Sequence, residues 1–143
     1  MSLTTNERRT GELFGPLWAQ LTDQQYKESV ALFSARFTAN GFDLGWFAGK
    51  DCLDVGTGSG RYALAMAMHG ANVTGCDISQ SGLAVARERT KGIPNLKFQF
   101  GSALDLPFPD ASFDFVCCAG VLHHTPSIDL AIQPMGYTAP AVK

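Results

Sequence analysis

The chain has 143 residues, of which 45% are hydrophobic and 17% are charged, and its formal net charge is -2 at pH 7. This length and composition fit a folded domain with a sizeable core and argue against a disordered chain. The weak negative charge gives no electrostatic basis for binding nucleic acid. No apolar run approaches the roughly 18 residues that a membrane-spanning helix needs, so we expect a cytoplasmic protein that acts on a small molecule.

The first part of the chain, residues 1–45, is predicted to be helical. Between Asp23 and Asn40, apolar side chains recur at intervals of four, three and four residues, at Tyr26, Val30, Phe33 and Phe37. This spacing predicts an amphipathic helix with Gly41 as its terminator. A second apolar group precedes this helix and consists of Phe14, Leu17, Trp18 and Leu21. One interpretation of the second group is a helix packed against the edge of a sheet.

The central part, residues 46–126, alternates between strand and helix patterns. Apolar runs predict strands over 51–55, 72–77 and 96–100, with helices over 61–69 and 80–90 between them. A fourth strand is expected over 113–118, after a turn-rich loop. Because right-handed crossovers make such strands parallel, the predicted fold is α/β, with a Rossmann-like, doubly wound sheet. The strand order is expected to reverse beside the first strand, which opens a crevice for a ligand.

Three glycines follow the first predicted strand directly, at Gly56, Gly58 and Gly60. Glycine lets the backbone turn sharply into the next helix and approach a ligand without interference from a Cβ atom. Asp77 lies 21 positions after Gly56 and ends the second predicted strand. In a Rossmann-type unit, an acid at about this spacing accepts hydrogen bonds from ribose hydroxyls. The two signals together predict a site for a nucleotide-like molecule.

The spacing of the glycines separates two classes of cofactor. A dinucleotide site has the pattern G-x-G-x-x-G and needs a small residue where Arg61 stands, which argues against a nicotinamide-dependent oxidoreductase. The pattern here is acid-x-G-x-G-x-G, beginning at Asp54, and it resembles motif I of the class I S-adenosylmethionine-dependent methyltransferases. Three later segments resemble the small-molecule branch of that family called type 11: GSALDLPF at 101–108, FDFV at 113–116 and GVLHH at 120–124. The resemblance extends from about Lys50 to Pro126.

This resemblance implies S-adenosyl-L-methionine as the cofactor and methyl transfer to an oxygen, carbon or sulfur atom of a small molecule. It also implies that the N-terminal segment forms a lid over the cofactor, and this interpretation stays open beside simple packing. The cofactor-binding residues that it implies are Asp54, Gly56, Thr57, Gly58, Gly60, Asp77, Ile78, Ser102, Ala103 and Ala119. Relatives usually carry an acid where Ser102 stands, so a hydroxyl replaces a carboxylate beside the adenine, where it accepts a hydrogen bond more weakly.

A dedicated catalytic residue is optional for methyl transfer, because positioning the nucleophile supplies much of the catalysis. His123 and His124 follow the fourth predicted strand, and one of them is a candidate general base or substrate contact. The alternative is that one histidine packs under the tail and the other is solvated. No metal site is expected, because the one further histidine, His69, lies at the far end of a helix. The cysteines lack C-x-x-C spacing and are expected to be small buried hydrophobes: Cys52, Cys76, Cys117 and Cys118.

The last part, residues 127–143, contains Pro134, Gly136 and Pro140 and is predicted to be an irregular tail. Members of the family continue through three more strands, so we expect a truncated chain or fragment whose sheet is incomplete after its fourth strand. Because such a sheet exposes an apolar edge, a homodimer that shields this edge is predicted. The alternative to an active methyltransferase is a non-catalytic cofactor-binding remnant that has lost its acceptor-binding half.

Overall fold

A parallel sheet of four strands forms the centre of the computed structural model, which describes residues 2–119 and 121. Its strands are β1 (Asp51–Val55), β2 (Asn72–Asp77), β3 (Leu96–Phe100) and β4 (Phe115–Cys117). They lie in the order β3-β2-β1-β4, and every neighbouring pair is parallel. The predicted α/β fold is therefore confirmed, and the strand order reverses beside β1 as expected.

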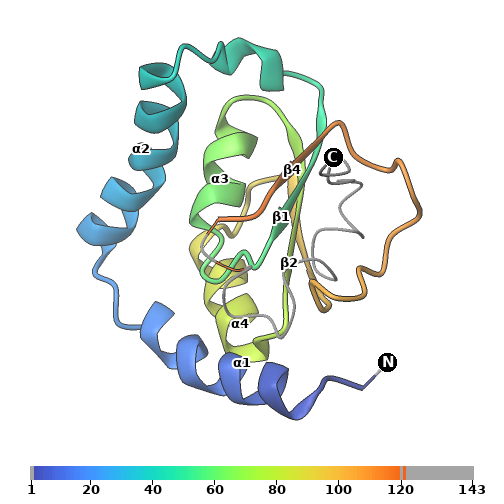
Figure 1. Cartoon of the computed structure of the whole chain (residues 1–143). Helices are drawn as coiled ribbons and strands as arrows, with labels where there is room; N and C mark the ends of the chain where they lie inside the picture. The colour runs from blue at the N-terminus through green and yellow to red at the C-terminus, as the bar shows by residue number, and fades with distance from the viewer. Residues whose placement is uncertain (1, 120, 122–143) are drawn as a thin grey trace, which may run out of the picture.

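Helices precede and connect these strands (Figure 1). They are α1 (Thr5–Trp18), α2 (Asp23–Ala39), α3 (Arg61–Met68) and α4 (Gln80–Arg89), with a short 3-10 helix, η1 (Leu44–Phe47), before β1. The bounds of α2, α3 and α4 agree with the predicted ones to within one residue. Ser79 caps α4, because its hydroxyl accepts the backbone N–H of Gly82 at 3.0 Å. No helix of the described residues is long and apolar enough to cross a bilayer.

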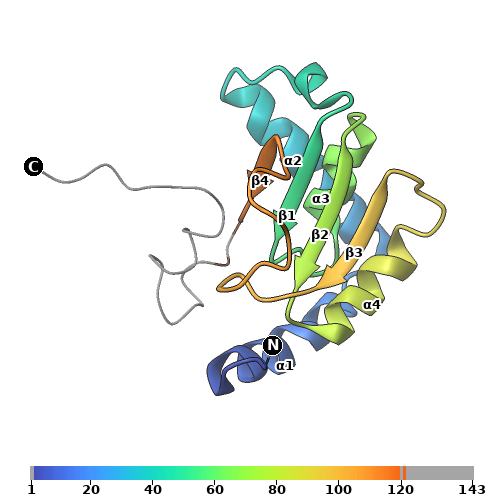
Figure 2. The same cartoon turned by 90° about the vertical axis from the view of Figure 1, so that its right-hand side faces the viewer.

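The two faces of the sheet are covered by different kinds of structure (Figures 1 and 2). On one face, α2 and α3 bury a cluster that includes Phe33, Phe47 and Met66. On the other face, the extended connection between β3 and β4 supplies Leu106 and Phe108, among others, against a smaller cluster built on Leu53, Val55 and Cys76. The strand residues alternate between these clusters because successive side chains of a strand point to opposite faces.

Two long-range contacts fix α2 to the glycine loop and to α4. The phenol of Tyr26 in α2 donates to the carbonyl of Ser59 at 2.9 Å, so α2 is tied to the glycine loop. At the start of the same helix, Asp23 pairs with Arg89 of α4 at 2.7 Å. Helix α1 packs against α4 and lies across the carboxyl ends of β2 and β3 (Figure 2). The N-terminal segment therefore borders the edge of the sheet at which parallel strands place their ligands.

Candidate functional site

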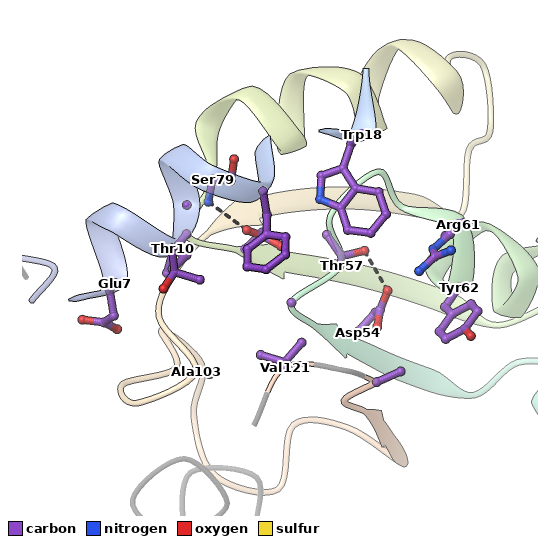
Figure 3. A pocket seen from close by; sticks show the side chains of 17 residues that line it. Glu7, Thr10, Trp18, Asp54, Thr57, Arg61, Tyr62, Ser79, Ala103 and Val121 are labelled. Atoms are coloured by element: carbon purple, nitrogen blue, oxygen red, sulfur yellow. Dashed lines mark hydrogen bonds between the residues drawn. The ribbon is translucent and has the colours of Figure 1, made fainter. Parts of the chain in front are cut away.

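A pocket lies at the carboxyl ends of β1 and β2, between these strands and α1 (Figure 3). Its wall is built from five segments: α1, the glycine loop with the start of α3, the end of β2, the loop after β3 and the loop after β4. The residues that line it are Glu7, Thr10, Gly11, Phe14, Trp18, Asp54, Gly56, Thr57, Arg61, Tyr62, Asp77, Ile78, Ser79, Gly101, Ala103, Ala119 and Val121. The pocket therefore opens where the reversal of strand order predicts a ligand crevice.

The glycine loop is a tight turn whose backbone is held by the protein itself. Gly56, Gly58 and Gly60 have φ of +70°, +55° and +78°, in the left-handed region that favours glycine. The N–H groups of Gly56 and Thr57 both donate to the carbonyl of Cys76, at 2.7 and 3.1 Å. The N–H of Gly60 donates to the carbonyl of Thr57 at 2.8 Å. Three backbone hydrogen bonds thus hold the loop, and two of them join it to the carboxyl end of β2.

Asp77 completes this loop from the end of β2. Its Oδ2 accepts the N–H of Gly58 at 2.8 Å, and its Oδ1 accepts the N–H of Ser79 at 2.8 Å. Burial raises the pKa of Asp77, and hydrogen bonds from the backbone of Gly58 and Ser79 oppose this shift. Each carboxylate oxygen has capacity for a second hydrogen bond. Asp77 is therefore oriented by the backbone and still able to accept donors from the pocket.

Asp54 is a buried acid at the end of β1, with 2% of its surface exposed. Burial raises its pKa to about 7, and the hydroxyl of Thr57 and the backbone of Ala63 lower it through hydrogen bonds. Thr57 Oγ1 donates to Asp54 Oδ2 at 2.7 Å (Figure 3). Within the described residues, neither Asp54 nor Asp77 pairs with a basic side chain. A cationic ligand group would therefore relieve an uncompensated negative charge at Asp54.

Aromatic side chains of α1 and α3 close the pocket beside the glycine loop. The indole of Trp18 lies against Gly58, where a Cβ atom would stand 2.7 Å from Trp18 Cε2. The guanidinium of Arg61 lies 4.9 Å from the Trp18 ring centroid and 5.4 Å from that of Tyr62. Arg61 thus brings a positive charge to the wall that also holds Asp54. At this end of the pocket, a zwitterionic group would find Asp54 for its positive charge and Arg61 for its negative charge.

At the opposite end of the pocket, α1 meets the loop after β3. Glu7 of α1 accepts the hydroxyl proton of Ser102, and Ser102 Oγ accepts the N–H of Leu104 at 3.0 Å. Ser102 is fully buried and does not line the pocket, whereas Glu7 does. At this end the pocket wall therefore includes the carboxylate of Glu7, beside the hydroxyl-bearing Thr10 (Figure 3).

Most of the residues expected to bind the cofactor lie together in this pocket. Seven of them line it: Asp54, Gly56, Thr57, Asp77, Ile78, Ala103 and Ala119. Gly58 and Gly60 lie behind the wall, covered by Trp18 and Phe98 respectively, and Ser102 lies beneath Glu7. The candidate catalytic residues His123 and His124 lie outside the described residues.

The interpretation of the cysteines as small buried hydrophobes is confirmed for two of the four free thiols, Cys52 and Cys76, which are fully buried. Cys117 and Cys118 are only partly buried, because β4 is the edge strand of the described sheet. Burial raises the pKa of Cys52 to about 11 and that of Cys76 to about 12, so both stay protonated at neutral pH. Within the described part of the chain, no three metal-ligating side chains form a cluster.

Helix α1 was expected only as part of a helical segment over residues 1–45, without bounds of its own, and Glu7 was not among the predicted pocket residues. The signal was present: Thr4 and Glu7 have the spacing of a capping box, and the structure contains both of its hydrogen bonds. Thr4 N–H donates to Glu7 Oε2 at 2.7 Å, and Glu7 N–H donates to Thr4 Oγ1 at 3.2 Å. The adjacent Gly15 and Pro16, which disfavour a helix interior, obscured this signal.

The geometry fits an elongated ligand with three chemically different parts. Asp54 and Arg61 at one end suit an amino acid group, Asp77 suits a pair of hydroxyls, and the end at Glu7 and Ala103 suits a flat, hydrogen-bonding group (Figure 3). A nucleoside linked to an amino acid has these parts in this order.

Comparison with known proteins identifies relatives that share this part of the chain. A family model described as a methyltransferase domain matches residues 53–135, more than half of the chain. A demethylmenaquinone methyltransferase of Tropheryma whipplei (strain Twist) is 42% identical over 85 residues, which are 59% of this chain and 35% of that protein. An uncharacterized methyltransferase, YcgJ of Bacillus subtilis (strain 168), is 37% identical over 83 residues, which are 57% of this chain and 33% of the relative.

Solved structures with the same fold include that of YcgJ, with a TM-score of 0.59 and 36% identity over 62% of this chain and 38% of that one. The [4+2]-cyclase SpnF has a TM-score of 0.62 and 30% identity over 74% of this chain and 39% of its own. The chain thus spans about a third of the length of the two curated relatives and somewhat more of these two solved chains.

Proposed function

The chain belongs to the methyltransferase-domain family, and from this membership we propose that it binds S-adenosyl-L-methionine and transfers its methyl group to a small molecule. The single observation that carries the proposal is the pocket in which Asp54, Asp77 and the glycine loop lie together. These residues come from the motifs by which the sequence resembles the family, and the chemistry of each suits one part of the cofactor.

The pocket residues would hold the cofactor through its three parts. Asp54 would attract the ammonium and sulfonium groups, and Arg61 would pair with the carboxylate of the methionine part. Asp77 would accept hydrogen bonds from the ribose hydroxyls with the lone pairs that the backbone leaves free. Ile78 and the amide of Ala103 would contact the adenine. Phe14 and Trp18 of α1 would exclude water from the reacting end.

When bound, S-adenosyl-L-methionine would supply an electrophilic methyl group on a positively charged sulfur, with neutral S-adenosyl-L-homocysteine as the leaving group. Asp54 does not take part in a covalent step, and its negative charge holds the charged end of the cofactor in place. His123 or His124 is proposed to remove a proton from the acceptor or to contact it, as the sequence predicts. The relatives named demethylmenaquinone methyltransferase support a small-molecule acceptor.

The test is an isothermal titration of the purified chain with S-adenosyl-L-homocysteine, the product of the transfer, beside a titration with NAD. Selective binding of S-adenosyl-L-homocysteine is the expected result. Binding of NAD alone, or of neither molecule by a folded sample, would contradict the assignment of the pocket.

Asp77→Asn provides a mutational test of the same site. The variant keeps the volume of the side chain and loses the negative charge, so the ribose loses charge-assisted hydrogen bonds. We expect the affinity for S-adenosyl-L-homocysteine to fall by about 1–3 kcal/mol in titration calorimetry. The control is Asp110→Asn, because Asp110 is exposed and lies outside the pocket wall. Equal affinity of both variants and the wild type would remove Asp77 from the site.

A second candidate function is binding of the cofactor without methyl transfer. It is favoured by the name of the solved relative SpnF, a [4+2]-cyclase, because a shared fold does not fix the reaction. An assay that measures the release of S-adenosyl-L-homocysteine distinguishes the two candidates in a panel of phenols, quinols and thiols. Turnover of any of these acceptors would establish the chain as a transferase.

A further inference from the structure

Glu7 is a charged side chain in the wall of the pocket for which the proposed function gives no role. It comes from the first turn of α1, and its exposed fraction is 8%. One carboxylate oxygen accepts the N–H of Thr4 at 2.7 Å, and the other accepts the hydroxyl proton of Ser102. Figure 3 shows Glu7 at the end of the pocket opposite to Arg61 and Tyr62.

The protonation state of Glu7 determines what it offers a ligand. Burial tends to raise its pKa, but hydrogen bonds from Ser102 and Thr4 outweigh burial and lower the pKa below the usual range. Glu7 is therefore ionised at neutral pH and is an acceptor only. Ser102 does not donate a proton to the pocket in place of Glu7, because its hydroxyl proton is donated to Glu7 and its oxygen accepts the N–H of Leu104.

The approach of α1 to the sheet brings this carboxylate to the pocket. Gly11 and Gly15 are buried where α1 passes the segment after β2. A Cβ atom at Gly11 would stand 3.3 Å from the carbonyl oxygen of Ile78, and one at Gly15 would collide with the hydroxyls of Ser79 and Ser81. Two glycines at a spacing of four thus let the helix backbone lie close to this segment. The position of Glu7 is therefore fixed by packing as well as by its hydrogen bonds.

The order of charges along the pocket identifies the part of the ligand that Glu7 faces. Asp54 and Arg61 mark the amino acid end and Asp77 marks the ribose, so the base occupies the remaining end, between Glu7 and Ala103. We propose that Glu7 is a specificity-determining residue that accepts a hydrogen bond from the exocyclic amino group of adenine, with Ser102 as the residue that positions it. This inference rests on the proposed function, because it assumes that the nucleoside cofactor binds here.

The consequence is discrimination between bases. An ionised carboxylate suits the amino group of adenine, which is a donor, and opposes the oxo group of hypoxanthine, which is an acceptor. A base whose oxo group faces Glu7 leaves two acceptors in contact in a buried place. S-inosyl-L-homocysteine, which differs from S-adenosyl-L-homocysteine in this group and in the protonation of the adjacent ring nitrogen, is therefore the informative probe.

The experiment titrates both probes into the wild type, Glu7→Gln and the control Glu12→Gln. Glutamine keeps an acceptor for the N–H of Thr4, and Glu12 is exposed on the same helix. We expect the wild type and the control to prefer S-adenosyl-L-homocysteine by about 10- to 100-fold. In Glu7→Gln this preference should fall to within about 3-fold of unity, because an amide offers both a donor and an acceptor to either base.

The outcomes separate the inference from the function on which it rests. If the wild type binds S-adenosyl-L-homocysteine and Glu7→Gln retains the full preference, Glu7 does not recognise the base and the proposed function stands. If the wild type binds neither probe, both the function and the inference are overturned. If circular dichroism shows that Glu7→Gln does not fold, the same titrations are made with Ser102→Ala. A reduced preference for S-adenosyl-L-homocysteine in that variant supports the positioning of Glu7 by Ser102, and an unchanged preference contradicts it.

Discussion

At the scale of single residues, the site depends on two acids that are held without basic partners in the described structure. Asp54 and Asp77 are each oriented by donors of the glycine loop, and burial raises the pKa of both. Their negative charge is thus costly in the free protein and useful when a cation or a set of hydroxyls arrives. Part of the binding free energy of a cationic ligand comes from removing this cost.

Asp54 gives the stability of the chain a distinctive pH dependence. Its pKa is raised from 3.8 to about 7, so between these values the folded chain holds a proton that the unfolded chain has released. Stability from this group is fully present below the unfolded pKa and is lost as the pH rises through the folded pKa. We expect the free energy of unfolding of the wild type to fall by about 1–4 kcal/mol from about pH 5 to about pH 8, relative to Asp54→Asn.

Urea unfolding of both chains across this pH range measures the effect. The carboxyl of Asp77, whose pKa is raised, and that of Glu7, whose pKa is lowered, are present in both chains, so the difference between the chains isolates Asp54. Asp51→Asn is the matched control, since Asp51 is an exposed residue of the same strand. Parallel curves for the wild type and Asp54→Asn would contradict the ionisation of a buried Asp54.

The site residues that could be predicted all belong to short sequence motifs. Asp54, Gly56 and Thr57 lie in one turn, and Asp77 follows at a fixed spacing at the end of the next strand. The role of Glu7 was not predictable in this way, because its contact with Ser102 joins residues 95 positions apart. The sequence indicated that a carboxylate was missing at Ser102, and the capping box at Thr4 and Glu7 marked the start of a helix without showing that Glu7 reaches Ser102.

At the scale of elements, α1 has two roles that the sequence analysis treated as alternatives. It packs against α4, and it contributes Glu7, Thr10, Gly11, Phe14 and Trp18 to the pocket wall. The apolar side chains of α1 lie in its second half, from Leu13 to Trp18, whereas residues 5–12 are almost entirely polar or charged. Movement of α1 as a lid stays a prediction.

Gly15→Ala tests how closely α1 must lie to the segment after β2. Alanine raises the helix propensity of this position by about 1 kcal/mol relative to glycine. Its methyl group would nevertheless collide with Ser79 and Ser81, so we expect α1 to lose about 1–3 kcal/mol of docking free energy. Hydrogen exchange of the α1 amides measures this loss, with Glu12→Ala on the exposed face as the control. Increased protection of α1 in Gly15→Ala would show that propensity outweighs packing.

At the scale of the whole molecule, the parallel sheet and its strand order were predictable, because crossover handedness and the glycine turn restrict the topology. What the sequence did not indicate is how the second face is covered. Within the described residues the connection from β3 to β4 contains no helix, and it covers Leu53, Val55 and Cys76 with side chains of an extended loop. The apolar residues of this loop, such as Leu106 and Phe108, are interrupted by Pro107 and Pro109 and show no helical or strand periodicity.

Strand β4 is an edge strand in the described sheet, and its outer backbone groups have no strand partner there. Exposed edges of this kind favour pairing with another chain. The homodimer expected from the sequence therefore stays a prediction, with twice the chain mass of 15.3 kDa. Light scattering coupled to size-exclusion chromatography measures this mass, and a monomer at every concentration tested would contradict the prediction.

The position of Trp18 also makes its intrinsic fluorescence a probe of ligand binding. The chain has two tryptophans, Trp18 against Gly58 in the pocket wall and Trp46 in the aromatic cluster of η1, at the opposite end of β1. Indole emission depends on nearby charges and on water, so a ligand that enters the pocket beside Trp18 should change the emission of Trp18 and leave that of Trp46 as an internal reference. In Trp46→Phe the remaining signal reports on the pocket alone, so the arrival and departure of a cofactor can be timed without labelling the chain.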